Sequence, residues 1–183
     1  MPAKPPDADS LYEAAMNHLA RYAATEAGLA RVLSRRIDRW GQKQALEEGA
    51  DATERARLSR LAKAAIPGVL ARLKALGALD DSAFAASRAR RLTRAGKSRR
   101  ATLAHLAAKG VHQPDLPDDP DRELAAACAF LRRRRGGAFG EAPSDKLLAA
   151  MARGGFTQAT AHQALSLPRE EAEQLIKSLE NLP

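Results

Sequence analysis

Basic side chains gather in one stretch of the sequence, where they could bind phosphate or carboxylate groups. Residues 82–114 contain eight basic residues and no acidic one. By contrast, residues 1–81 contain 13 basic and 11 acidic residues, and residues 115–183 contain 9 basic and 11 acidic residues. The net charge of +8 therefore equals the charge of this stretch alone. Its candidate contacts to a partner or to DNA are Arg88, Arg90, Arg91, Arg94, Lys97, Arg99 and Arg100.

A surface helix that is merely solvated usually carries interspersed acidic residues, because like charges at i,i+4 repel by ~0.2–0.5 kcal/mol per pair. No acidic residue occurs across these 33 positions, so a binding face is the favoured interpretation. Contact with phosphates would make the affinity fall steeply with salt. A second basic run fits equally well a second contact or cations that stabilise a helix C-terminus; it consists of Arg132, Arg133, Arg134 and Arg135.

The sequence contains no pattern that supports catalysis, a cofactor or a metal site. Asp80 and Asp81 are better explained as helix caps than as catalytic carboxylates. The four histidines form no ligand pattern, and 96–98 (GKS) is only the tail of a phosphate-binding loop. Cys128 lies on an apolar stripe and is interpreted as a small buried hydrophobe. We expect a protein that is not an enzyme.

Composition limits the cellular setting and the partners. A pI near 10.1 indicates affinity for nucleic acid or acidic protein surfaces. No apolar run approaches the ~20 residues of a membrane span, the N-terminus lacks the apolar region of a signal peptide, and one cysteine forms no intrachain disulfide. We expect a cytoplasmic monomer without membrane contact.

Helical signals cover the first half of the chain. Ser10 and Glu13 have the spacing of a capping box before an apolar stripe. Thr25 can cap a second helix that buries Leu29, Leu33, Ile37 and Trp40, and Gly41 and Gly49 bracket a linker or frayed helix. A third helix over 51–76 would bury Leu58, Leu61, Ala65, Val69, Leu73 and Leu76, and Pro67 should kink or split it.

The second half is expected to be helical as well, and no strand is expected. Helices are predicted over 81–95 and 98–109, with stops at Gly96 and Gly110, followed by a loop over 112–120. Further helices are expected to begin after the caps Asp119, Ser144 and Thr157 and at Pro168, with a stop at Gly154-Gly155.

An internal repeat underlies these helices. Leu103, Leu106, Gly110 and Val111 match Leu148, Met151, Gly155 and Phe156 at a constant offset of 45 residues. The pattern predicts an all-α fold of tandem three-helix repeats in an elongated, curved helical array. The expected division is a disordered N-terminus 1–8, a first repeat 9–78, a shortened second repeat 79–118, a third repeat 119–167 and a C-terminal extension helix 168–183.

The sequence resembles the RecX family of regulatory proteins over roughly residues 11–165. The most specific part lies in 66–111 and is carried by Ile66, Val69, Leu70, Leu73, Gly77, Ala78, Leu79, Asp80, Asp81, Phe84 and Ala85. It continues through Gly96, Arg99, Arg100, Leu103, Leu106, Gly110 and Val111, and Gly155-Phe156 resembles the third repeat of the family. Two departures are the loop 112–120, in place of the third helix of the second repeat, and longer segments at 41–62 and 168–183.

The resemblance implies a modulator of RecA, the recombinase that polymerises on single-stranded DNA. Its partners would be the RecA filament and, weakly and electrostatically, single-stranded DNA. It would restrain filament growth, ATP hydrolysis, strand exchange and the co-protease activity that triggers the SOS response. Two alternatives from the residues remain: a sequence-reading DNA-binding regulator with a helix–turn–helix around Gly96, and a helical adaptor for an acidic protein.

Overall fold

The chain is helical throughout the part that the structure describes. A computed structural model describes residues 4–46, 51–140 and 142–181. All regular elements in these residues are α-helices or single 3₁₀ turns, so the predicted all-α class is confirmed. No helix among them is long and apolar enough to cross a bilayer. The chain divides into two compact units, Met1–Phe84 and Ala85–Pro183. The division into three-helix repeats stays a prediction.

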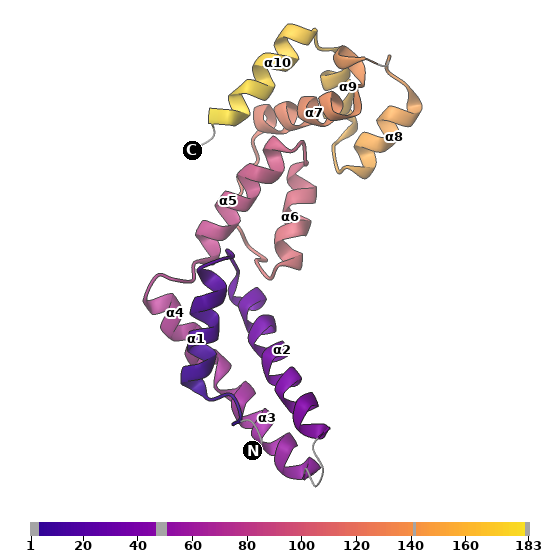
Figure 1. Cartoon of the computed structure of the whole chain (residues 1–183). Helices are drawn as coiled ribbons and strands as arrows, with labels where there is room; N and C mark the ends of the chain where they lie inside the picture. The colour runs from indigo at the N-terminus through magenta and orange to yellow at the C-terminus, as the bar shows by residue number, and fades with distance from the viewer. Residues whose placement is uncertain (1–3, 47–50, 141, 182–183) are drawn as a thin grey trace. The chain divides into compact units, whose positions relative to one another are not determined.

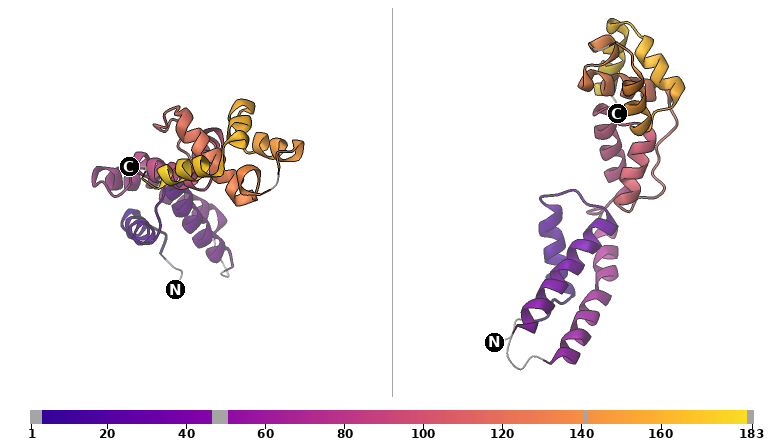
Figure 2. Two further views of the ribbon diagram at one scale, coloured as in Figure 1. Left: turned by 90° about the horizontal axis from the view of Figure 1, so that it is seen from above. Right: turned by 90° about the vertical axis from the view of Figure 1, so that its right-hand side faces the viewer.

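The first unit has its own apolar core. It is built from α1 (Ala8–Leu19), α2 (Glu26–Ala45), α3 (Ala52–Ala64) and α4 (Ile66–Ala75). Helix α3 packs along α2, and α4 packs against α1 and α2 (Figures 1 and 2). The predicted stripe Leu29, Leu33 and Ile37 is fully buried, because residues four apart share one helix face. Trp40, the next residue of the stripe, is only half-buried.

Helix α1 begins earlier than the sequence predicted. Its N-cap is Asp7, whose carboxylate accepts a hydrogen bond from the Ser10 N–H at 3.0 Å, while the Ser10 hydroxyl accepts from the Asp7 N–H at 3.0 Å. The predicted pair of Ser10 and Glu13 is therefore wrong, because an equally good cap lies immediately after the two prolines. Residues 4–7 of the expected disordered segment lead into this cap, and residues 1–3 lie outside the described residues.

Pro67 splits the third predicted helix, as expected. The helices α3 and α4 meet at Ala65, so one helical phase does not run through both. The predicted burial of Leu61 and Leu76 is wrong, since these side chains are 57% and 63% exposed. After the break, the buried face consists of Ile66, Val69, Leu70 and Leu73.

Helix α2 continues past Gly41 to Ala45, so the first residues of the predicted linker or frayed helix are helical. A Cβ at Gly41 would lie 3.3 Å from the hydroxyl oxygen of Ser59 in α3. Glycine thus lets the two helices approach closely, although a glycine inside a helix lowers stability by ~1 kcal/mol relative to alanine. Gly49, the other end of the predicted linker, lies outside the described residues.

The second unit is arranged around helix α7. Besides most of α5 (Asp81–Arg94), it contains α6 (Arg99–Ala108), α7 (Pro120–Arg134), η1 (Gly137–Phe139), α8 (Asp145–Arg153), α9 (Gln158–Ser166), α10 (Arg169–Ser178) and η2 (Leu179–Asn181). Helices α9 and α10 pack on α7 (Figure 1). Every residue from Leu124 to Ala129 is buried, and four of these six are alanines. Such small side chains allow close packing around a helix that is apolar on all sides.

Helix starts and stops follow the local sequence. The predicted caps Thr25, Asp119, Ser144 and Thr157 all accept hydrogen bonds from backbone N–H groups of the helices they precede. The stretch before α7 is a loop, as predicted. Helices α4, α5, α6 and α8 end in left-handed glycines, namely Gly77, Gly96, Gly110 and Gly155.

The two segments that match at an offset of 45 residues, at the ends of α6 and α8, have the same helix C-cap structure. In α6 the N–H of Val111 donates to the carbonyl of Leu106 at 3.0 Å, and in α8 the N–H of Phe156 donates to the carbonyl of Met151 at 3.2 Å. Both bonds close the Schellman motif that a left-handed glycine permits. The sequence match therefore reports an equivalent local structure.

Candidate functional site

Two basic runs that lie far apart in the sequence meet in the second unit. The first predicted run extends from α5 through the following turn into the start of α6, and the second forms the end of α7. The guanidinium of Arg133 donates to the carbonyl of Ala95 at 2.7 Å and so links them. The two candidate contacts of the sequence analysis therefore belong to one surface.

Gly96 allows this close approach. It adopts φ +70°, which ends α5, and a Cβ here would lie 2.5 Å from the backbone nitrogen and 2.8 Å from the Cα of Phe130. These distances are too short for any side chain, and the atoms in the way are backbone atoms of α7. Gly96, predicted only as a helix stop, is thus also the contact between the turn and α7.

A pocket of about 290 Å³ opens beside this contact, and we call it the basic pocket. It is lined by Ala95, Gly96, Lys97, Phe130, Arg133 and Arg134. The Arg134 guanidinium lies 4.9 Å from the centroid of the Phe130 ring, and this ring meets Phe156 edge-on at 5.6 Å. Three cations that line one pocket suit an anionic ligand such as a phosphate.

Phe130 was not among the predicted contact residues. The sequence does contain a signal for it: Phe130 precedes Arg134 by four residues, so the two side chains lie on the same face of a helix.

Two of the predicted contact residues are used inside the fold. Arg94 donates to the backbone carbonyls of Leu179 at 2.8 Å and Glu180 at 3.0 Å, at the end of α10. Arg99 donates twice to the carbonyl of Leu116, at 2.9 and 3.1 Å, and so fixes the loop before α7. Carbonyl groups occupy these donors without cancelling their charge.

Arg88 also has an internal partner. Its Nε donates to Nε2 of His105 in α6 at 3.0 Å, so this ring nitrogen carries no proton. Burial first, and then the charges of Arg88, Lys109 and Lys97, lower the pKa of His105. A neutral imidazole therefore lies beside the basic run and adds no further charge.

The remaining basic residues of the predicted set are available to a partner. None of them makes a hydrogen bond or ion pair within the residues that the structure describes, and all but the half-buried Arg90 are exposed. These residues are Arg90, Arg91, Lys97, Arg100, Arg132 and Arg135. Glu123 forms no ion pair with any of them, and its carboxylate accepts the backbone N–H of Arg99 at 2.8 Å.

The turn between α5 and α6 is covered on one side. Ser98 is fully buried, caps α6, and donates its hydroxyl to the carbonyl of Gly154 at 2.7 Å. A Cβ at Gly155 would lie 2.5 Å from the Ser98 oxygen, so the start of α6 packs closely on the turn after α8. In a helix–turn–helix protein the first residues of the second helix read the bases. Here the cap of α6 is buried, while Arg100 in its first turn is exposed.

The two acidic residues of the family-like signature cap helices, as the sequence analysis favoured. Asp80 accepts hydrogen bonds from the N–H groups of Ser82 at 2.8 Å and Ala83 at 3.0 Å, at the start of α5. Asp81 accepts from the N–H of Glu26 at 2.8 Å and thereby caps α2 as well. This contact between Asp81 and Glu26 spans 55 residues and was not predicted.

The other signature residues have packing positions. Leu79, Leu106 and Phe156 are buried, whereas Phe84 and Leu103 are half-buried. Leu79 and Phe156 belong to the apolar cores of the first and the second unit, respectively.

The described residues contain neither a metal-binding cluster nor an exposed thiol. Within the described ranges, no cluster of three or more His, Cys, Asp or Glu residues could hold a metal ion. Cys128 is fully buried in α7, and burial raises the pKa of its thiol to about 11. A thiol with these properties is unreactive in the folded protein.

Comparison with protein-family models, with curated proteins and with solved structures finds no match. The resemblance to RecX therefore rests on the residues quoted for it.

Proposed function

We propose that this protein is a non-enzymatic regulator that binds the RecA filament on single-stranded DNA and restrains its growth and ATP hydrolysis. Strand exchange and SOS co-protease activity would fall with them. The observation that carries the proposal is the basic pocket with its neighbouring exposed cations, because residues 95–97 of the segment 66–111 that resembles RecX form part of its lining.

Charge supports an anionic partner. Lys97, Arg133 and Arg134 line one pocket, and the exposed cations near them have no carboxylate partner among the described residues. A phosphate backbone or an acidic protein groove would supply the missing counter-charge. Arginine suits this contact because its planar fork binds phosphate or carboxylate through two hydrogen bonds.

The test is the ATPase activity of RecA on single-stranded DNA, measured with and without this protein. We expect the wild-type chain to lower the rate. Combined reversal of Arg91→Glu, Lys97→Glu and Arg100→Glu should raise the half-inhibitory concentration roughly tenfold or more, since several phosphate-type contacts are lost. All three side chains are exposed, so helicity should be unchanged.

A matched control reverses Arg21, Arg31 and Arg60, which are exposed residues of the first unit, to Glu. This variant has the same net charge and should inhibit like the wild type. An unchanged ATPase rate with the wild-type protein contradicts the proposed function. Equal inhibition by both triple variants contradicts only the assignment of the surface. If the wild-type protein binds an acidic protein, without RecA or DNA present, as tightly as it binds the RecA filament, the adaptor alternative is favoured.

A further inference from the structure

A second and larger pocket lies in the first unit, about 580 Å³ in volume. One wall is the segment 4–7 before α1, and the other is the second half of α2, with Arg36, Arg39, Trp40 and Lys43. We call it the Trp40 pocket. Its volume falls in the range of small-ligand sites, about 300–1,000 Å³.

The pocket arises where the apolar stripe of α2 continues beyond its cover. Leu29, Leu33 and Ile37 are fully buried, whereas Trp40 follows them at helical spacing and is half-buried. Helix α1 begins only at Ala8, so beside Trp40 the wall is the extended segment before it. An aromatic side chain is thereby left at the edge of the core.

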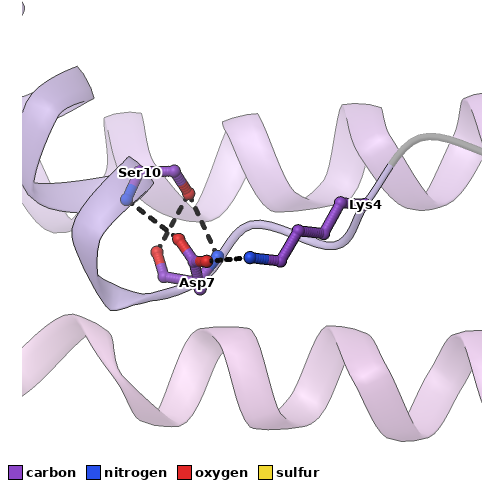
Figure 3. A network of polar contacts seen from close by, with 3 residues as sticks. All are labelled: Lys4, Asp7 and Ser10. Atoms are coloured by element: carbon purple, nitrogen blue, oxygen red, sulfur yellow. Dashed lines mark hydrogen bonds and ion pairs between the residues drawn. The ribbon is translucent and has the colours of Figure 1, made fainter.

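Among the described residues, one acidic side chain lines the pocket, and it already has hydrogen-bond partners. Asp7 binds Lys4 Nζ at 2.7 Å and the N–H of Ser10 at 3.0 Å (Figure 3). These contacts, led by the hydrogen bond from Lys4, lower the pKa of the Asp7 carboxyl. Lys4 and Asp7 therefore offset each other in charge.

Three cations remain on the opposite wall. Arg36, Arg39 and Lys43 are spaced i, i+3 and i+7, so they share one face of α2 with Trp40. They make no ion pair within the described residues, and Arg39 donates only its Nε, to the carbonyl of Arg35 at 3.3 Å. Its terminal guanidinium nitrogens have no described partner.

Cations beside an aromatic ring match the chemistry of single-stranded nucleic acid. Such proteins bind the backbone phosphates with basic residues and stack bases on aromatic side chains without reading their edges. An acidic peptide would use the cations but would have no need of the tryptophan.

We propose that the Trp40 pocket binds a nucleotide of single-stranded DNA, with a phosphate at Arg36, Arg39 and Lys43 and a base against Trp40. This site is separate from the basic pocket, and its occupation does not require RecA.

The chain contains one tryptophan, so its fluorescence reports on this pocket alone. The wild-type protein is titrated with an oligothymidylate of about 15 nucleotides, with heparin as a polyanion without bases, and with poly-glutamate. We expect strong quenching by the oligonucleotide and little by the other two. Equal quenching by heparin or poly-glutamate would overturn the nucleotide assignment in favour of a general anion site or an acidic protein.

The variant Arg36→Gln/Arg39→Gln/Lys43→Gln should raise the half-saturating oligonucleotide concentration roughly tenfold or more. The control variant Arg21→Gln/Arg31→Gln/Arg60→Gln removes the same charge and should bind within about twofold of the wild type. Equal weakening in both variants would overturn the proposal.

Fluorescence anisotropy of a labelled oligonucleotide tests the stacking separately. Trp40→Leu should weaken binding roughly tenfold and Trp40→Phe much less, because a phenyl ring can still stack. Binding by anisotropy without any tryptophan quenching would place the DNA elsewhere and refute the site. None of these readouts involves RecA, so they are distinguishable from a failure of the proposed function.

Discussion

Arginine side chains in the second unit fall into two groups that look alike in the sequence. Arg94 and Arg99 bind backbone carbonyls of distant segments and hold the fold together. Arg91 and Arg100 are exposed and make no hydrogen bond or ion pair within the described residues. Only the second group can exchange water for a partner without loss of internal contacts.

This difference predicts opposite outcomes for two neighbouring arginines. Arg94→Ala should lower the free energy of unfolding by about 1–2 kcal/mol, because two charge-assisted hydrogen bonds to carbonyls of η2 are lost. Arg91→Ala should change it by less than about 0.5 kcal/mol. Urea unfolding followed by circular dichroism measures both, and equal destabilisation would contradict the division into two groups.

His105 makes the second unit sensitive to acid. Burial, Arg88, Lys109 and Lys97 lower its pKa below the ordinary value of 6.5, so the unfolded chain binds a proton more readily than the folded one. As the pH falls below 6.5, the unfolded state gains protons first and the free energy of unfolding decreases.

We therefore expect wild-type protein to lose more stability between about pH 7.5 and about pH 5.5 than His105→Gln. Urea unfolding at both pH values gives the comparison, in which titration of the other groups cancels. An equal loss in the two proteins would show that the pKa of His105 is the same folded and unfolded.

Helices of this protein end in glycine for two different reasons. Gly77 needs only its left-handed backbone, because a Cβ there would meet no atom within 4 Å. Gly96 needs the same backbone and in addition the absence of a side chain, because α7 lies against it. The sequence pattern is the same at both helix ends.

Alanine substitution should separate these reasons. Gly77→Ala should cost about 1–2 kcal/mol, the strain of a left-handed residue. Gly96→Ala should cost about 2–5 kcal/mol, since overpacking adds to the strain. Trp40 fluorescence follows unfolding of the first unit, and reaction of the Cys128 thiol follows that of the second. Equal costs at the two sites would contradict the close contact at Gly96.

At the scale of the whole molecule, each unit has a separate apolar core and one chemical reporter. Trp40 is a half-buried residue of the first unit, and Cys128 is fully buried in the core of the second. The candidate sites are divided in the same way, with the Trp40 pocket in one unit and the basic pocket in the other.

Separate cores predict separate unfolding. Gly96→Ala should speed the reaction of Cys128 with a thiol reagent by more than about tenfold, while the urea midpoint of Trp40 fluorescence stays unchanged. The buried thiol, with its pKa of about 11, reacts only when the second unit opens. A parallel shift of the fluorescence midpoint would mean that the two units unfold as one.

The sequence by itself determined the helical class, the excess of basic charge in 82–114, and nearly all helix starts and stops. These features are local: a cap side chain bonds within three residues, and a left-handed glycine acts on its own turn. The misplaced start of α1 and the exposed Leu61 are also local errors, one from two competing caps and the other from a break that changed the helical phase.

Only the tertiary structure decided which basic residues are available and where they gather. Arg94 is distinguished from Arg91 by a carbonyl 85 residues away, and the basic pocket exists because Arg133 reaches Ala95 across 38 residues. The Trp40 pocket likewise depends on how far α1 extends along α2. Hydrogen bonds and packing between distant segments leave no periodic signal in the chain, so these properties follow from the fold alone.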